Sequence, residues 1–378
     1  MLFAKNLFNI KLSSIFSIAS IFVLFFSGVM YLEYGNYSIY IFYLTVILSI
    51  FFFRVKSSFS KEYFLIIFLL IMPSLINFSS SSAVTVIFHL SLITFAFVLA
   101  SIDFSVNKTL KVILRSYILI TFLAFLAIFF NIGLLIEMLG FVINYKDGIY
   151  RINAFATEPS YAAFLISLIW FFLAKENLIS TKETFLVIAS LILLKSLYGL
   201  LLALLIFLQI MDLRRLHLKF HKYIFFLSIA ALYLIFFDTF LINKLNNVLV
   251  FTGPSSELDI QSGAAAVRLL PYVYMFSSDL GSTFSIFGSG AGVFQNQFYN
   301  DYAYLFTEGV VLSGHMAGVI YDYGILTFLA IFIIFVKKFP AKKYVSYPFV
   351  ILLFLNTGIG TYLFVASLSL ILRTKHDD

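Results

Sequence analysis

Apolar residues form uninterrupted blocks close to twenty residues long, and this pattern limits the possible folds more than any other feature. A helix of about 20 apolar residues crosses the hydrocarbon core of a bilayer. Only 11% of the residues are charged and 62% are hydrophobic, whereas soluble domains carry about 25% charged residues. The chain cannot cover a soluble surface. We therefore expect an all-α polytopic membrane protein, with residues 1–378 forming a single integral membrane domain.

The hydropathy pattern predicts eleven or twelve transmembrane helices. Two segments leave the number open, because 184–210 is short for two spans and 344–372 could hold one or two. We interpret 184–210 as two short or broken helices that meet near Lys195, since a single span would put the basic residues of 214–222 on the outside. The predicted spans are 12–32, 37–53, 62–78, 84–102, 113–136, 159–174, 180–196, 197–211, 223–241, 318–336 and the block 344–372.

The basic residues indicate the orientation of these spans. Cytoplasmic loops are enriched in lysine and arginine, and most basic residues fall on one side if the N-terminus is cytoplasmic. The basic residues left on the outer side are Lys146, Arg151, Lys195, Lys244 and Arg268. Orientation and contact with anionic membrane lipids therefore explain the net charge of +7, and we expect no nucleic-acid partner.

Two outer loops are long, about 137–158 and 242–317. Loops of this length inside a compact protein are usually functional or disordered, and the aromatic content of the second argues against disorder. The chain has no cysteine, which excludes disulfides and thiolate metal sites. We therefore expect function to reside in the outer loops.

Arg151 and Arg268 are the arginines of these outer loops. A guanidinium is always charged and grips phosphate with two parallel hydrogen bonds, although pairing with lipid headgroups is the alternative. Lys195 stands in the turn between two short predicted helices. A lysine near membrane depth costs about 2.5–3.5 kcal/mol and indicates a site by default, whereas snorkelling to the surface is the alternative.

Glu158 precedes Pro159, and proline favours the first turn of a helix. The carboxylate could simply favour the helix start through the dipole. Alternatively it orients Arg151 or accepts a proton. Tyr161 follows within helical reach and could stack on a sugar.

His315 stands where a glycine-rich loop enters a predicted helix. Its imidazole titrates near neutral pH and suits removal of a proton from a hydroxyl, although an interfacial histidine with a backbone partner is the alternative. His217 and His221 have the spacing of a metal pair, but Asp212 is the only acid close by, so we expect no metal and no cofactor. The glycines of 288–292 could form an anion-binding nest.

Taken in order, these residues resemble the O-antigen polymerase and ligase superfamily of membrane glycosyltransferases. The resemblance lies in Arg151 followed by Glu158-Pro159-Ser160, in Arg268, in Gly288-Ser-Gly-Ala-Gly-Val-Phe294, and in His315 followed by Gly324. Where family polymerases often have a glycine after the first outer arginine, this chain has Ala162. The choice between polymerase and ligase therefore stays open.

The resemblance implies a bacterial inner-membrane protein with a GT-C-like helix bundle, its large outer loop in the periplasm. It implies an active site on the periplasmic side that acts on oligosaccharides carried by undecaprenyl diphosphate. We expect Arg151 and Arg268, with Lys195 as a third cation, to bind the diphosphate. His315 is the first expected base and Glu158 the second, or the partner that orients it.

Tyr161 and Tyr323 are expected to line the path of the sugar. We expect an O-antigen or surface-polysaccharide polymerase that needs no metal, and a chain-length regulator protein is an open additional partner. The nearest alternative is a ligase that transfers polymer to lipid A core. A flippase or transporter of lipid-linked glycans is the alternative from another class, although the predicted span interiors hold almost no ionisable residues.

Overall fold

The computed structural model of the chain is mostly helical. It describes residues 18–27, 31–34, 37–52, 60–76, 80–101, 106–146, 149–212, 271–272, 286, 288–302 and 316–373. Arg268 and His315, the predicted span 223–241 and most of the predicted loop 242–317 lie outside the described residues.

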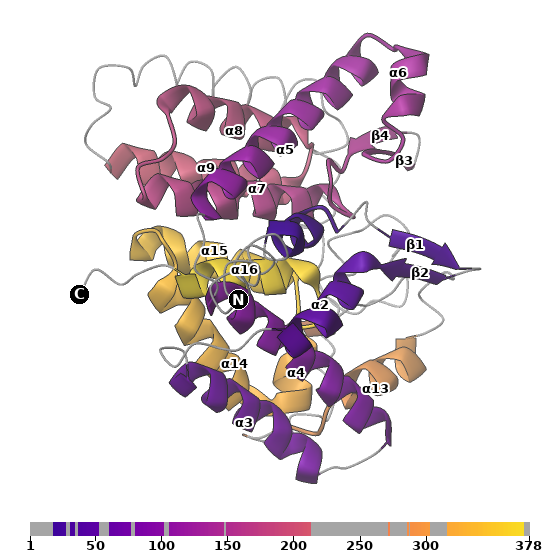
Figure 1. Ribbon diagram of the computed structural model, residues 1–378, viewed down its shortest axis with the longest axis vertical. Helices are drawn as coiled ribbons and strands as arrows, with labels where there is room; N and C mark the ends of the chain where they lie inside the picture. Colours follow the sequence, from indigo (N-terminus) through magenta and orange to yellow (C-terminus); the bar gives the residue numbers. More distant parts are fainter. Residues whose placement is uncertain are drawn as a thin grey trace, which may run out of the picture.

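The described elements are long and short helices and two small antiparallel hairpins (Figure 1). The helices up to the first outer loop are α2 (Ile41–Phe52), α3 (Ser60–Ile76), α4 (Ser80–Ser101), α5 (Val106–Phe129) and α6 (Gly133–Met138). The later helices are α7 (Pro159–Lys175), α8 (Thr181–Leu193), α9 (Leu197–Asp212), α13 (Val293–Tyr302), α14 (Met316–Lys338), α15 (Lys343–Asn356) and α16 (Tyr362–Arg373). The strands are β1 (Tyr31–Tyr34), β2 (Tyr37–Tyr40), β3 (Ile143–Lys146) and β4 (Ile149–Ile152).

Three of the described helices are long and apolar enough to cross a membrane: Ser82–Ser101, Asn107–Phe129 and Met316–Lys338. Their outward faces carry apolar side chains such as Ile87 and Leu119, each more than half exposed. An apolar exterior of this kind suits contact with lipid. The prediction of an all-α membrane protein is therefore supported, and the shorter apolar helices α7, α9, α15 and α16 add to the bundle.

The two segments of uncertain span number each form two helices. Helices α8 and α9 are separate and meet at Lys195, whose φ is +49°. Helices α15 and α16 are likewise separate, joined by residues 357–361. The prediction of two short helices meeting near Lys195 is confirmed.

One predicted boundary is wrong, and one predicted loop contains strands that the sequence did not reveal. The predicted span 37–53 begins in strand, because residues 37–40 pair with β1 and the helix starts only at Ile41. The predicted loop 137–158 contains the antiparallel hairpin β3–β4, with Ile143 opposite Ile152. Strand β3 alternates apolar and polar side chains in the order Ile-Asn-Tyr-Lys, which suits a pleated strand better than a helix.

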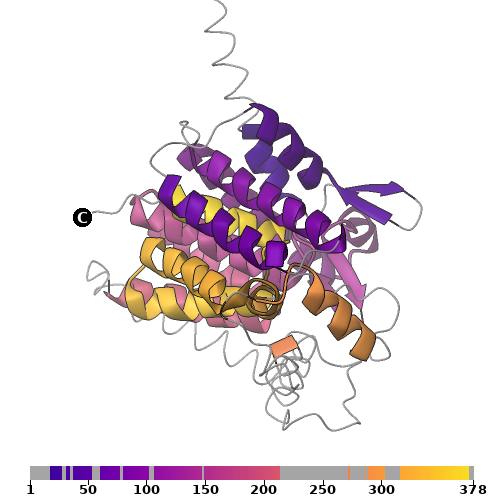
Figure 2. The same cartoon turned by 90° about the horizontal axis from the view of Figure 1, so that it is seen from below.

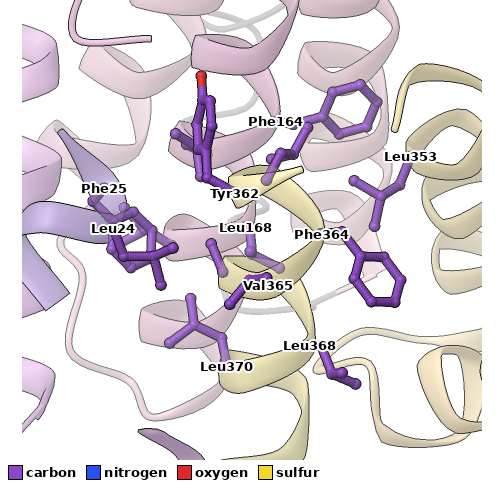
Figure 3. Close-up of a cluster of buried hydrophobic side chains, with 14 of the residues drawn as sticks. Leu24, Phe25, Phe164, Leu168, Leu353, Tyr362, Phe364, Val365, Leu368 and Leu370 are labelled. Carbon is purple, nitrogen blue, oxygen red and sulfur yellow. The ribbon is translucent and has the colours of Figure 1, made fainter. Parts of the chain in front are cut away.

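Helices α7 and α16 form the centre of the core. Every residue of α16 from Tyr362 to Leu372 is buried, and α7 is buried from Ala162 to Leu173. A helix that is apolar on all sides belongs inside a bundle, and α16 packs against α4, α7 and α14. Figure 3 shows the side chains around α16, with the hydroxyl of Tyr362 pointing away from the cluster.

The bundle has two chemically different ends. Hairpins β1–β2 and β3–β4 and helix α13 lie at one end, to the right in Figure 1, which we call the hairpin end. The view from below in Figure 2 also places both hairpins and α13 on one side. The opposite end, which we call the basic end, holds the termini of helices with the described basic residues Lys111, Arg115, Lys175, Lys182, Lys337, Lys338, Lys342, Lys343 and Arg373.

Charged contacts join the helices at the basic end. The Arg115 guanidinium of α5 lies 2.6 Å from the Glu183 carboxylate of α8, and the Lys338 ammonium of α14 lies 2.8 Å from Glu62 of α3. Arg373 donates to the Leu99 carbonyl oxygen at 2.7 Å. These contacts join α5 to α8, α14 to α3 and α16 to α4 at the basic end, whereas α7, α9, α14 and α16 begin at the hairpin end.

Candidate functional site

The segment after β4 leads the chain into α7 through a buried turn. The Asn153 backbone N–H donates to the Val142 carbonyl oxygen at 2.8 Å, and the Asn153 side-chain amide donates to the Thr157 carbonyl oxygen at 3.2 Å. Ala154 has a φ of +50° and is fully buried. Such a backbone conformation is uncommon outside glycine and asparagine, and the two hydrogen bonds of Asn153 hold the turn in place.

Glu158 stands at the N-cap position of α7, with extended backbone, and Pro159 occupies the first turn as predicted. Its side chain makes no capping hydrogen bond to the helix backbone. It is exposed, and its Oε2 accepts a hydrogen bond from the Ser160 hydroxyl at 3.1 Å. The carboxylate therefore lies at the helix start without serving as a hydrogen-bonded cap.

Tyr362 joins the starts of α7 and α16. The Thr157 backbone N–H donates to the Tyr362 hydroxyl at 3.1 Å, and the Thr157 hydroxyl lies 3.2 Å from it. The rings of Tyr161 and Tyr362 meet edge to face with centroids 5.6 Å apart. The first turns of the two helices therefore lie side by side, and Tyr161 stands at their junction.

Helix α9 places a third N-terminus beside these two. The ring of Phe164, in the second turn of α7, and the ring of Tyr198, in the first turn of α9, have centroids 5.4 Å apart. Half-buried Lys195 lies two residues before the start of α9. Each helix N-terminus carries unsatisfied N–H groups and roughly half a positive charge. Three parallel N-termini and a lysine thus create a region that favours an anion.

The predicted arginines relate to this region differently. Arg151 is half-buried on β4, opposite Asn144, and the turn that leads into α7 follows it directly. Arg268 lies outside the described residues, but the Tyr272 hydroxyl a few positions later donates to the Phe354 carbonyl oxygen at 2.8 Å, near the hairpin end of α15. The roles predicted for Arg151, Arg268, Lys195 and Glu158 remain predictions.

The predicted base His315 also lies outside the described residues. It directly precedes Met316, which is buried at the start of α14. Its predicted role therefore stays open, while the helix that follows it begins at the hairpin end.

The glycine run 288–292, where an anion nest was predicted, contacts a carboxyl side chain of the protein itself. The Gly292 and Phe294 backbone N–H groups each donate to the Asp322 carboxylate at 2.8 Å. The Gly290 N–H donates to the Asp322 carbonyl oxygen at 2.9 Å. Because Asp322 occupies these donors, the nest secures α13 to α14.

Tyr323 is only 1% exposed. Its hydroxyl lies 2.7 Å from Nδ1 of His89 on α4. Its predicted place on the sugar path remains a prediction, because the described contact is with a neighbouring helix.

Two residues were given no role in the sequence interpretation. Nothing in the sequence distinguishes Tyr362 from the other tyrosines, of which the chain has 23 in all. His89 did have a signal, since it is the only ionisable residue in α4, and ionisable residues inside a membrane span are expensive and usually functional.

Among the residues that the structure describes, no three histidine, aspartate or glutamate side chains could together hold a metal ion. The site chemistry in this part of the chain comes from backbone N–H groups, hydroxyls and single charges.

No protein family matches the chain, and no curated protein or solved structure matches it either.

Removing the Tyr362 hydroxyl tests the junction between α7 and α16. In Tyr362→Phe, the Thr157 N–H loses its acceptor, and an unsatisfied buried donor costs about 1–3 kcal/mol. We expect a Tm several degrees lower in detergent, measured by thermal unfolding. Tyr347→Phe is the matched control, because Tyr347 is exposed and should unfold like the unmodified protein. Equal Tm values for the two variants would contradict this description of the junction.

Proposed function

We propose that the chain is a membrane glycosyltransferase of the O-antigen polymerase type. It transfers a growing glycan from undecaprenyl diphosphate to the next lipid-linked repeat unit. The observation that carries the proposal is the convergence of the α7, α9 and α16 N-termini beside Lys195 and the Glu-Pro-Ser segment. This region is suited to a diphosphate that gains negative charge as it leaves.

The bond changes explain which groups are needed. The bond between the sugar anomeric carbon and the diphosphate oxygen breaks, and the electron pair leaves with the diphosphate. A hydroxyl of the acceptor sugar forms the new glycosidic bond and loses its proton to a base. Diphosphate is already a good leaving group and needs stabilising positive charge rather than a general acid, unlike the leaving group in glycoside hydrolysis.

The residues divide between these two tasks. Arg151 and Arg268, with Lys195, stabilise the diphosphate, because arginine binds phosphate through two hydrogen bonds. His315 accepts the proton, with Glu158 as the second candidate base. Tyr161 stands at the start of α7, where it can contact the sugar through its ring.

The proposal includes a GT-C-like bundle whose active site faces the periplasm, covered by the loop of residues 242–317. The positive-inside rule supports this orientation, because basic residues gather at the end opposite the hairpins.

The orientation predicts a labelling pattern that the cysteine-free sequence makes simple to read. Tyr145→Cys lies in an exposed position on β3, and Asn177→Cys in the exposed α7–α8 connection. In spheroplasts, a membrane-impermeant maleimide should label Tyr145→Cys directly and Asn177→Cys only after permeabilisation. The reverse pattern would place the hairpin end in the cytosol and contradict a periplasmic site.

Purified protein in liposomes tests the reaction. A polymerase adds radiolabelled lipid-linked repeat units to one another, whereas a flippase moves them without forming a bond. A ligase transfers finished polymer only when lipid A core is present. Elongation without lipid A core is the expected result, and failure to form any glycosidic bond with either acceptor would contradict the proposal.

A further inference from the structure

Several helices of the core are too short to cross a bilayer. Helix α15 has 14 residues and α16 has 12, which correspond to about 21 and 18 Å at 1.5 Å per residue. The hydrocarbon core is about 30 Å thick. Both helices approach the basic end, where Arg373 bonds α4. Measured from the basic end, the turn between them, residues 357–361, therefore lies at less than the full thickness of a bilayer core, and we call it the sunken turn.

Helix α14 is interrupted at a similar depth. It contains non-helical backbone at Gly324, with φ 83° and ψ 166°. Backbone that leaves the helix at membrane depth is tolerated where it is buried in protein or lines an aqueous cavity. Discontinuous helices of this kind frequently form binding sites in membrane proteins.

His89 of α4 lies beside Tyr323 of α14 and Gly360 of the α15–α16 turn. It lies about 13 Å along α4 from Ser80, at 1.5 Å per residue. Its Nδ1 is 2.7 Å from the Tyr323 hydroxyl, and its Nε2 faces Gly360, where an added Cβ would lie 3.6 Å from that nitrogen. The residue is half-buried. The Nε2 atom of His89 therefore faces the sunken turn at Gly360, which has no side chain.

Asn356, at the start of the same turn, supplies an independent observation. It is 1% exposed, and neither its side-chain oxygen nor its nitrogen has a hydrogen-bond partner. Leaving a buried donor or acceptor unsatisfied destabilises the folded protein. Such a group in a native protein requires an explanation, such as a partner that binds later.

We propose that the sunken α15–α16 turn is a carbohydrate subsite, in which His89 and Asn356 form hydrogen bonds with sugar hydroxyls of a lipid-linked glycan. This subsite rests on the proposed function, because it adds sugar recognition to the diphosphate site. The Tyr323 hydroxyl orients the imidazole through Nδ1, so that Nε2 is directed at the ligand. Asn356 can both donate and accept, which suits a hydroxyl.

The accessibility of His89 provides a direct measurement. Diethyl pyrocarbonate reacts with imidazole nitrogen, and mass spectrometry locates the modified histidine. In protein reconstituted in nanodiscs, we expect undecaprenyl-diphosphate-linked oligosaccharide to reduce modification of His89 at least ten-fold. Undecaprenyl diphosphate without sugar should leave it unchanged. Equal protection by both lipids would show that the sugar does not occupy the subsite and would overturn the inference.

Gly360→Ala narrows the subsite without disturbing the backbone. The added methyl group makes ordinary contacts at 3.6 Å with His89 Nε2 and with Phe88 Cε1. We expect an unchanged Tm and at least ten-fold weaker protection by the oligosaccharide. Gly133→Ala is the matched control, because nothing lies within 4 Å of its added Cβ. Protection in Gly360→Ala equal to that of the control would overturn the inference.

Asn356→Leu separates a ligand-binding role from a structural one. If Asn356 waits for a ligand, replacing it with an apolar side chain of similar size should raise the Tm and weaken protection of His89. A lower Tm with full protection would show a structural amide and overturn its assignment to the subsite.

The proposed function and the subsite can fail separately. Elongation by the unmodified protein with no sugar-dependent protection of His89 would overturn the subsite alone. Absence of both elongation and protection would overturn both proposals. Sugar-dependent protection together with elongation supports both.

Discussion

Arg151→Ala should reduce chain elongation by about 10²–10³-fold, because loss of one positioned hydrogen-bond donor to a developing anion has this effect in other enzymes. Arg151 is half-buried on β4, and the turn into α7 follows it. When the Arg151 guanidinium is removed, the departing diphosphate still has the helix N-termini and Lys195 beside it. It loses the partner that binds through two hydrogen bonds. The measurement is the rate of radiolabelled repeat-unit addition by purified protein in liposomes.

Arg151→Lys distinguishes bidentate binding from charge alone. Lysine retains the charge but lacks the planar fork, so this variant should also be poor. Lys182→Ala removes a cation from the exposed, opposite end of α8 and serves as the charge-matched control. Elongation by Arg151→Ala at the rate of this control would show that Arg151 does not act on the diphosphate.

Gly288→Ala should prevent stable folding of the hairpin end. Gly288 has a φ of +83°, and an added Cβ would lie 2.4 Å from the Asp322 carbonyl oxygen and 2.5 Å from the Gly324 nitrogen. Both neighbours are backbone atoms and cannot move aside. Strain at such a φ costs about 1–3 kcal/mol, and overpacking commonly adds about 1–3 kcal/mol.

We therefore expect a loss of monodisperse protein in detergent, or a Tm lower by ten degrees or more, as measured by size-exclusion chromatography and thermal unfolding. Gly133→Ala, with open space around its added Cβ, should behave as the unmodified protein. A Gly288→Ala protein as stable as Gly133→Ala would contradict the packing of the glycine run against α14.

The glycine run 288–292 shows which part of a local structure the sequence can predict. The run 288–292 predicted a nest from its composition. The group that contacts the run could not be predicted, because Asp322 comes from another helix, α14. A glycine pattern gives the local backbone donors, whereas the partner depends on how helices pack.

The apolar blocks of the sequence predicted the helices, because a chain segment surrounded by lipid has to form a helix. In lipid, backbone groups must be satisfied within the segment, so a long apolar block is sufficient evidence for a helix. The hairpin β3–β4 was missed because it lies in a segment between spans, where alternation over the four residues of β3 is a weak signal and β4 shows none.

The candidate site was predicted only in part. The Glu-Pro-Ser segment predicted a helix start, and α7 does begin at Pro159. The neighbouring starts of α9 and α16 could not be deduced, since nothing in the sequence shows that Tyr362 meets Thr157 across two hundred residues. Convergence of helix ends is a property of tertiary packing.

The position of the diphosphate in an experimental structure of the complex tests the account most directly. Cryo-electron microscopy of the protein in nanodiscs with undecaprenyl diphosphate would locate the two phosphates. We predict that they lie at the N-termini of α7, α9 and α16, within hydrogen-bond reach of Arg151 or Lys195. Phosphates bound at the basic end, or away from these three helix starts, would contradict it.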